Sequence, residues 1–136
     1  MKNTNSKIFA KKIRANSLRM VSISNSSHIG SCLSVADILA VLFTNILKIF
    51  PKDPKNINRD RLIFSKGHAS AIYYAALAES GFFDIKKLKS YCNNNSNLFG
   101  HVTKNNTPGV EFSTGSLGHG LPVASGIAFS LKNKKR

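Results

Sequence analysis

Residues 61–70 of the chain have the sequence RLIFSKGHAS, and this stretch decides the expected fold. Its apolar run predicts a short β-strand over residues 61–65, and a turn at Gly67 leads into a helix from about Ala69 to Ser80. Glycine allows a positive φ angle or a close approach of backbone to a ligand. His68 stands directly behind that glycine and can supply a hydrogen-bond donor or a proton near neutral pH. The stretch therefore predicts a strand–turn–helix unit with a polar side chain at its turn.

Two further helices are expected before this unit. Residues 7–24 carry apolar side chains on a loosely apolar side, which predicts the first helix. The second helix has the clearest pattern, with apolar residues at helical spacing between residues 35 and 47. Ser34 and Asp37, three residues apart, predict a capping box at its start. Pro51 then predicts the end of that segment.

The rest of the chain is expected to be rich in loops. Gly81 is a natural C-cap for the helix that follows His68, and Asp84 predicts the cap of a short helix that ends near Tyr91. A loop over residues 92–116 precedes a last helix, from Leu117 or Gly118 towards Leu131. This order is mixed α/β, but the one or two predicted strands are too few to cover the helices. The domain is therefore expected to be incomplete.

Composition indicates one domain without a membrane anchor. The chain has 136 residues, of which 42% are hydrophobic, and this is enough for a core. The longest apolar run, residues 35–47, includes Asp37, Thr44 and Asn45, which argues against a membrane span. Cys32 and Cys92 show no CxxC or metal-ligand spacing. A soluble protein of the reducing cytoplasm is the expectation.

The charge balance suggests binding to an anion. The chain has 20 basic and six acidic residues, which gives a net charge of +14. A nucleic-acid-binding protein is one interpretation, but the lysines gather at the two chain ends and around residues 86–89. The aromatic residues lie inside apolar segments, so no platform for stacking bases is visible. The charge is better explained by a solvated surface, whose field would still attract a small anion.

Each of the four histidines lies within two residues of a glycine: His28 in HIG, His68 in KGH, His101 in FGH and His119 in GHG. The glycine-rich segments SKGHAS and STGSLGHG both precede a predicted helix, whose free N–H groups and positive dipole end can hold a phosphate. The alternative is that the glycines serve tight packing and that the histidines are ordinary core or surface residues. Both interpretations stay open on pattern alone. Glu111, beside the second segment, is interpreted as a structural carboxylate.

Three longer segments resemble a known protein family, both in their amino-acid sequences and in the order in which they occur. They are SHIGSCLSVADILAVLF (27–43), RDRLIFSKGHASAIYYAALAESGFF (59–83) and FGHVTKNNTPGVEFSTGSLGHGLPVASGIAFSLK (99–132). Together they are similar to the start of transketolase, and most of all to the form whose N-terminal half is a separate short subunit. The resemblance covers about residues 8–132, which is nearly the whole chain.

The resemblance implies part of a thiamine diphosphate enzyme that transfers a two-carbon ketol unit between sugar phosphates. The implied fold class is α/β, as the helix-rich N-terminal portion of a thiamine diphosphate-binding fold with an incomplete parallel sheet. His28 matches a residue that reaches the substrate at the reacting centre, and His101 matches one that lines the pocket of cofactor and substrate, so both are expected to be catalytic. His68 matches a residue beside the diphosphate. Further cofactor contacts are implied for the GSLG loop: Gly115, Ser116, Leu117 and Gly118.

The chain also departs from the family pattern. The family's GHPG is SHIG here, with Ser27 in place of a glycine and Ile29 in place of a proline, so the loop that carries His28 is expected to differ in shape. His119 stands where the family usually has glutamine. The family's GDG motif and its asparagine, which hold Mg²⁺, do not occur, so residues 1–136 are expected to be a partial domain without its metal ligands.

These departures suggest that the chain alone is inactive. The resemblance implies that it works with the remaining transketolase domains or subunits, in a complete enzyme that is a dimer. One alternative is an inactive remnant, or a module that binds homologous subunits without catalysis. The least favoured alternative is a basic nucleic-acid-binding protein. The isolated chain is also expected to self-associate through the face left open by missing strands.

Overall fold

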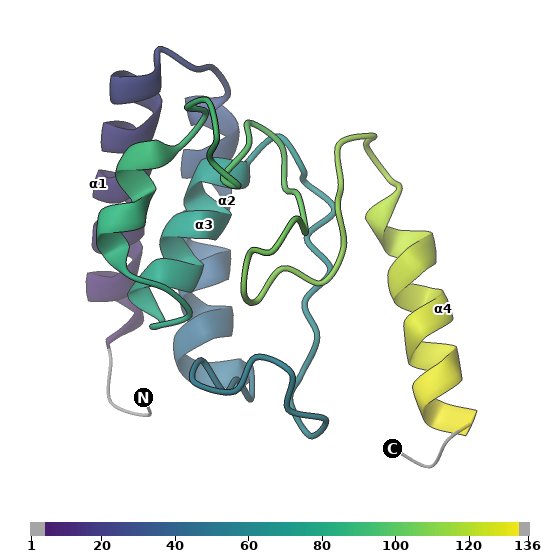
Figure 1. Cartoon of the computed structure of the whole chain (residues 1–136). Helices are drawn as coiled ribbons and strands as arrows, with labels where there is room; N and C mark the ends of the chain where they lie inside the picture. The colour runs from purple at the N-terminus through teal and green to yellow at the C-terminus, as the bar shows by residue number, and fades with distance from the viewer. Residues whose placement is uncertain (1–4, 134–136) are drawn as a thin grey trace.

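The structure is a computed structural model that describes residues 5–133, and within that range it consists of helices joined by long loops (Figure 1). The helical elements are α1 (Ser6–Ser24), α2 (Ile29–Val41), η1 (Leu42–Ile46), α3 (Ser70–Glu79), η2 (Ile85–Ser90) and α4 (Gly120–Asn133). The first three α-helices pack against one another, and η2 packs on α1 and α3. Helix α4 stands apart from this group, on the far side of the loops (Figure 1).

Helix α1 confirms the first predicted helix. The Asn5 side chain accepts a hydrogen bond from the Lys7 backbone N–H at 2.8 Å, which caps the first turn. Asn25 ends the helix in the left-handed conformation, with φ of 49°. The buried residues recur every three to four positions and turn one side of the helix to the core: Phe9, Ala10, Ile13, Ser17 and Met20.

Helix α2 starts earlier than predicted, and the predicted capping box is wrong. Ser34 lies inside the helix, where its hydroxyl donates to the Ser31 carbonyl at 3.0 Å. Asp37 instead accepts two hydrogen bonds from the Arg14 guanidinium of α1, at 2.6 and 3.0 Å. The N-cap is His28, well before Ser34 in the sequence. The polar spacing at Ser34 thus reflects a contact between helices rather than a helix start.

Residues Ile29–Ile46, which span α2 and the π-helical turn η1, are long and apolar enough to cross a membrane by length and composition. The sequence-based argument against a membrane span relied on the polar residues within this run. By length and composition the segment nevertheless qualifies as a possible span, so these criteria do not support that argument. The core helix of a soluble protein meets the same criterion, and α2 does pack against both α1 and α3.

Helix α3 is the centre of the core. Every residue from Ser70 to Ala78 is buried, and the Tyr73 ring stacks on Phe64 with ring centroids 4.8 Å apart. The helix ends as predicted, because Gly81 adopts a φ of 89° and its N–H donates to the Ala78 carbonyl at 2.9 Å. This helix therefore gives the loops around it a rigid support.

The predicted strand at residues 61–65 is not observed, and residues 5–133 contain no β-strand. The segment is non-helical and runs between α3 and α4 without a neighbouring strand, so no ladder can form. The α/β class is therefore not visible in the secondary structure of the described residues. Helix α4 also starts later than predicted, at Gly120, so that His119 lies in the preceding turn rather than in the first helical turn.

Candidate functional site

Three of the four histidines meet in space, although they come from segments far apart in the sequence. The ring centroid of His28 lies 5.4 Å from that of His68 and 5.7 Å from that of His101. His28 precedes α2, His68 precedes α3, and His101 lies in the long loop before α4. His28 and His101 are exposed and His68 is half-buried, so the cluster is open to a ligand from solvent.

The position of His101 is fixed by hydrogen bonds from α3 to the backbone around it. The Ser70 hydroxyl donates to the Gly100 carbonyl at 2.7 Å. The Tyr74 hydroxyl donates to the His101 carbonyl at 3.1 Å and accepts from the Thr103 N–H at 3.0 Å. Because Ser70 and Tyr74 are fully buried, these contacts hold the loop on the rigid core helix.

Gly67 brings the turn at SKGHAS into contact with the glycine-rich loop. A Cβ atom at this position would lie 2.3 Å from the Thr114 carbonyl oxygen, so only glycine fits without displacement. The Gly67 carbonyl accepts from the Val102 N–H at 2.9 Å, and the Val102 carbonyl accepts from the Thr114 N–H at 2.9 Å. The Thr114 hydroxyl donates to the Phe64 carbonyl at 2.7 Å. These bonds tie three loops together beneath the histidines.

The predicted cofactor-contacting loop, Gly115, Ser116, Leu117 and Gly118, is exposed along its whole length. A Cβ at Gly115 would lie 3.7 Å from the His101 ring, which places the loop beside the histidine cluster. Gly118 adopts a φ of 85°, a conformation that favours glycine. Among residues 5–133, no hydrogen bond is made by the backbone N–H groups of residues 115–118. Successive free N–H groups are suited to the oxygens of a phosphate.

His28 has an uncommon backbone conformation. Its φ is 75°, which is strained for a residue other than glycine, and the residue forms the N-cap of α2 without a side-chain capping bond. The Ser27 hydroxyl lies 2.8 Å from His28 Nδ1. This contact fixes the ring and leaves Nε2 free to meet a ligand. Ser27 therefore supplies a hydrogen bond to the ring of the histidine.

Within the histidine cluster, the surroundings change the pKa of His68 most clearly. Partial burial lowers the pKa of its ring below the ordinary value of 6.5, and the positive field of His28, Lys66 and His101 lowers it further. The ring is therefore neutral at pH 7, with one nitrogen as donor and the other as acceptor. An anion placed among these groups would offset the repulsion between them.

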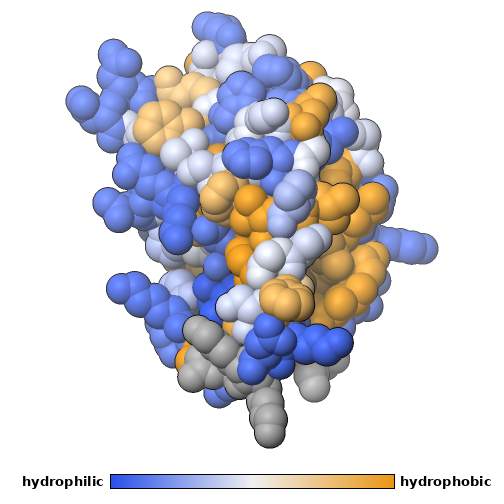
Figure 2. Space-filling view, turned by 90° about the vertical axis from the view of Figure 1, so that its right-hand side faces the viewer, coloured by the Kyte–Doolittle hydropathy of each residue, from blue (hydrophilic) through white to orange (hydrophobic). Residues whose placement is uncertain are grey.

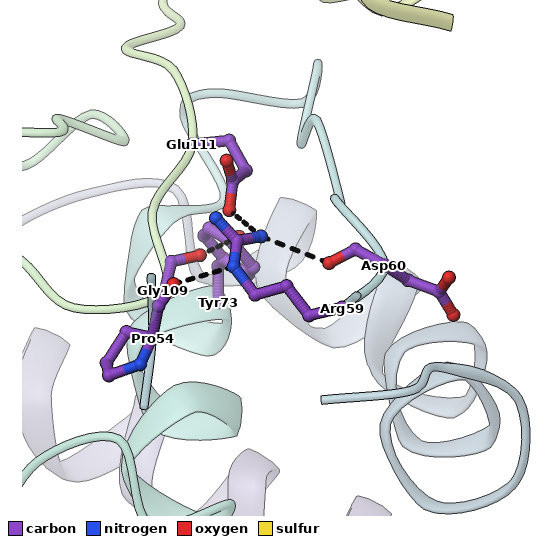
Figure 3. A network of polar contacts seen from close by, with 6 residues as sticks. All are labelled: Pro54, Arg59, Asp60, Tyr73, Gly109 and Glu111. Carbon is purple, nitrogen blue, oxygen red and sulfur yellow. Dashed lines mark hydrogen bonds and ion pairs between the residues drawn. The ribbon is translucent and has the colours of Figure 1, made fainter. Parts of the chain in front are cut away.

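His119 lies outside this cluster. Its ring packs edge-on against Phe112, with centroids 5.4 Å apart. Glu111 has the structural role expected from the sequence, since it forms an ion pair with Arg59 in which both side chains are 13% exposed (Figure 3). Arg59 also donates to the carbonyls of Pro54, at 2.6 Å, and Asp60, at 3.1 Å.

Sequence reasoning missed several residues that position the site. Ser70, Tyr74 and Thr114 hold the loops, and the hydroxyl of Ser65 accepts from the Gly120 N–H at 3.2 Å at the start of α4. No periodic signal marks these side chains, because each acts on a segment remote in the sequence. The pair of Arg59 and Glu111 does have a signal, since the two belong to the family-like stretches RDR and PGVE.

No group of three or more His, Cys, Asp or Glu side chains that could hold a metal ion occurs among residues 5–133. The two cysteines are free, with Cys32 buried and Cys92 exposed. The described residues thus fit an anionic ligand at the histidines and the glycine-rich loop, but they do not form a site for Mg²⁺.

Comparison with known proteins gives a consistent result. A family model described as "Transketolase, thiamine diphosphate binding domain" matches residues 5–136. The chain is 48% identical over 105 residues to one of the subunits of the apulose-4-phosphate transketolase of Actinobacillus succinogenes, covering 77% of this chain and 38% of that protein. It is 42% identical over 125 residues to transketolase 2 of Escherichia coli, covering 91% of this chain and 19% of the relative.

A solved structure is similar over almost the whole chain. The crystal structure of transketolase from Campylobacter jejuni matches with a TM-score of 0.87 and 42% sequence identity, covering 97% of this chain and 21% of that one. The chain therefore spans about a fifth of the full-length transketolases and less than two fifths of the Actinobacillus succinogenes relative.

Proposed function

The chain belongs to the transketolase family, within its thiamine diphosphate-binding domain, and we propose that it supplies the diphosphate-binding part of a ketol-transferring enzyme. The substrates of that enzyme would be sugar phosphates, between which a two-carbon ketol unit moves. The observation that carries the proposal is the meeting of His28, His68 and His101 beside a loop with four free backbone N–H groups.

In this proposal the diphosphate of the cofactor is held by His68 and by the backbone of residues 115–118. The neutral His68 ring donates one hydrogen bond, and the loop N–H groups donate to the remaining oxygens. Helix α4 begins at Gly120, separated from the loop by His119 alone, and the dipole of the helix favours a negative charge at this end. The net charge of +14 would speed the approach of the anion.

Thiamine diphosphate, when bound, supplies the electron sink that carries the two-carbon unit. His28 and His101 would act on the oxygens of the substrate, because both residues are exposed and His101 lies beside the cofactor loop. With Ser27 on Nδ1, the Nε2 atom of His28 can donate a hydrogen bond or hold a proton at a developing oxyanion. His101, whose backbone is fixed by Tyr74, can do the same from its place beside His28.

Among residues 5–133 no group of three or more His, Cys, Asp or Glu side chains could hold Mg²⁺, so no step is assigned to that metal here. The Actinobacillus succinogenes relative is named as one subunit of its enzyme, which agrees with a role beside further subunits. We therefore expect this chain to function together with additional transketolase domains or subunits, in a dimeric enzyme. A location in the cytoplasm stays a prediction, compatible with two free cysteines.

The proposal is tested by NMR of the histidine rings during titration with thiamine diphosphate. The ring signals of His68 and His101 should move together and saturate. Thiamine, which lacks the phosphates, is the matched control and should leave His68 unchanged. A His68 signal that stays fixed, or that moves equally with both compounds, would reject the diphosphate site.

A further inference from the structure

A groove of about 570 Å³ lies between α1 and η2. Its α1 wall consists of two rows of side chains, each with a spacing of four residues: Lys11, Ala15, Arg19 and Ile23 in the first row, and Lys12, Asn16 and Met20 in the second. The rows extend along one side of the helix for about 18 Å at 1.5 Å per residue. Rows of this kind are the ridges between which the side chains of another helix pack. The groove therefore has the length and the shape of a site for a helix.

The lining of the groove includes an apolar strip to which both walls contribute. The opposite wall comes from η2 and consists of Ile85, Lys86, Leu88 and Lys89. Met20 and Leu88 are buried, with exposed fractions of 3% and 5%, whereas Ile23 and Ile85 are 61% and 44% exposed. Methionine has a flexible side chain that adapts to partners of different shape. These four side chains thus form an apolar strip that the described residues cover only in part.

The groove carries a surplus of positive charge. It is lined by five cations and one acid: Lys11, Lys12, Arg19, Lys86 and Lys89, with Glu79. The Glu79 carboxylate already accepts a hydrogen bond from Asn16 Nδ2 at 2.8 Å and forms an ion pair with Lys12 at 3.7 Å. The other four cations are exposed and form no ion pair among residues 5–133. An occupant with carboxylates would therefore be complementary to the groove in charge.

We infer that this groove, here called the basic groove, binds an amphipathic helix of a partner protein that carries acidic side chains beside its apolar stripe. The stripe, at spacing i and i+4, would cover the apolar strip of the groove. Carboxylates on one side of the stripe would meet the cations of α1, and those on the other side would meet the cations of η2. The inference goes beyond the proposed function, because the basic groove shares no residue with the histidine cluster or the loop over residues 115–118.

The basic groove is also separate from the apolar surface of α4. Helices α1 and α4 lie on opposite sides of the molecule (Figure 1). Figure 2 shows the side on which α4 lies, where apolar surface gathers across the middle of the face. A partner attracted by apolar surface alone would be expected there, since Leu121 and Phe129 of α4 are 70% and 69% exposed. Dependence on the cations of the basic groove distinguishes the two surfaces.

Three other occupants fit these observations less well. A second copy of the chain offers no acidic helix, because α1–α4 contain only Asp37 and Glu79, and both are in ion pairs. Its net charge of +14 also repels another copy. A nucleic acid would meet the lysines, but no aromatic side chain within residues 5–133 lines the groove to stack on its bases. A membrane surface would meet the exposed lysines without reaching the buried Met20.

The probe for this inference is a synthetic peptide of about 18 residues, because isolated helices shorter than about 12–15 residues are marginal in water. It carries leucine at helical spacing along one side and glutamate on both flanks of that stripe. One control peptide has glutamine in place of every glutamate, and another has the same composition with its leucines spread around the helix. Fluorescence anisotropy of the labelled peptides, titrated with the full chain, should show saturable 1:1 binding of the acidic peptide and at least tenfold weaker binding of both controls.

A double variant of the chain tests the charged rims. Arg19→Glu with Lys86→Glu reverses one exposed cation on each wall and should weaken binding of the acidic peptide at least tenfold. Lys52→Glu with Lys55→Glu is the matched control, because it makes the same change in net charge at exposed lysines outside the groove. This control should leave the affinity nearly unchanged.

A second pair of variants tests the apolar strip. Ile23→Asp places a charge on an exposed side chain of the strip and should also weaken binding at least tenfold. Leu18→Asp makes the same substitution at a 50% exposed residue of α1 that does not line the groove, and it should leave the affinity unchanged. All these variants should keep the circular dichroism spectrum of the wild type, because the substituted side chains are exposed.

An equal loss of affinity in the two double variants would show that net charge alone attracts the peptide, and this would overturn the inference. So would equal binding of the acidic peptide and the control with spread leucines, or no saturable binding by a folded wild-type chain. Vesicles of phosphatidylserine and phosphatidylcholine are titrated in parallel. Tighter binding to vesicles than to the peptide, lost on Arg19→Glu with Lys86→Glu, would assign the groove to a membrane surface and overturn the inference as well.

Discussion

Gly67 and Gly30 differ in what surrounds them, and the difference predicts opposite effects of the same substitution. A Cβ at Gly67 would meet the Thr114 carbonyl oxygen at 2.3 Å, whereas a Cβ at Gly30 would meet nothing within 4 Å. Gly67→Ala should lower the free energy of unfolding by about 1–3 kcal/mol, because the backbone of Thr114 must move.

Gly30→Ala is the control and should raise the free energy of unfolding by about 0.5–1 kcal/mol, because alanine is the better helix former within α2. Urea denaturation of both variants measures the two values. An equal change in the free energy of unfolding for both variants would show that the loop of Thr114 does not pack closely against Gly67.

His68 provides a second prediction at the residue scale. Its pKa in the folded chain lies below 6.5, first because of partial burial and then because of the positive groups around it. The unfolded chain therefore takes up this proton at a higher pH, so the contribution to stability decreases as pH falls through about 6.5. Inorganic pyrophosphate should raise the pKa of His68, since an anion offsets the repulsion. NMR titration of the ring with and without pyrophosphate measures this, and an unchanged pKa would contradict it.

At the scale of structural elements, the ion pair of Arg59 and Glu111 holds together two loops that lie far apart in the sequence (Figure 3). Glu111→Gln should lower the free energy of unfolding by about 2–4 kcal/mol, because it leaves a largely buried guanidinium without its charge partner. Thermal denaturation measures the loss.

The pair of Arg14 and Asp37 is the control for that prediction. Asp37 is 76% exposed, so solvent screens its attraction to Arg14, and Asp37→Asn should change stability little. If Asp37→Asn proved as damaging as Glu111→Gln, burial would not be what makes the Arg59 pair important.

Helix positions could be predicted from the sequence where apolar side chains repeat at helical spacing, as in α1 and in residues 35–47. The Gly81 C-cap was also predictable, because a positive φ has a clear residue preference. The start of α2 was not, since Ser34 and Asp37 imitate a capping box while Asp37 actually binds Arg14. The strand at residues 61–65 could not be confirmed, because a strand exists only when a neighbour pairs with it.

The site was predicted at the level of its parts rather than its geometry. Motif likeness indicated His28, His68, His101 and the loop over residues 115–118, and the structure brings these parts together. Their roles in binding and catalysis stay predictions. The supporting hydroxyls of Ser70, Tyr74 and Thr114 were not predictable, because their partners are carbonyls 27 to 50 residues away.

At the scale of the whole molecule, α4 presents large apolar side chains that no part of residues 5–133 covers, and these should govern the behaviour of the isolated chain. The hydrophobic effect predicts weak self-association through α4. Leu121→Asp combined with Phe129→Asp should suppress it, and stability should be preserved because both side chains are exposed. Sedimentation velocity measures the change. A wild-type chain that remains monomeric at every concentration would contradict this prediction.

The measurement that tests the central claim most directly is a calorimetric titration of thiamine diphosphate into the complex of this chain with the unmatched part of the Campylobacter jejuni enzyme. Mg²⁺ should be present, since its ligands are expected from the partner. The proposed function predicts saturable binding by the wild-type complex and at least tenfold weaker binding by His68→Ala. Equal affinity in both complexes, or no binding by an intact wild-type complex, would contradict the claim that this chain holds the diphosphate.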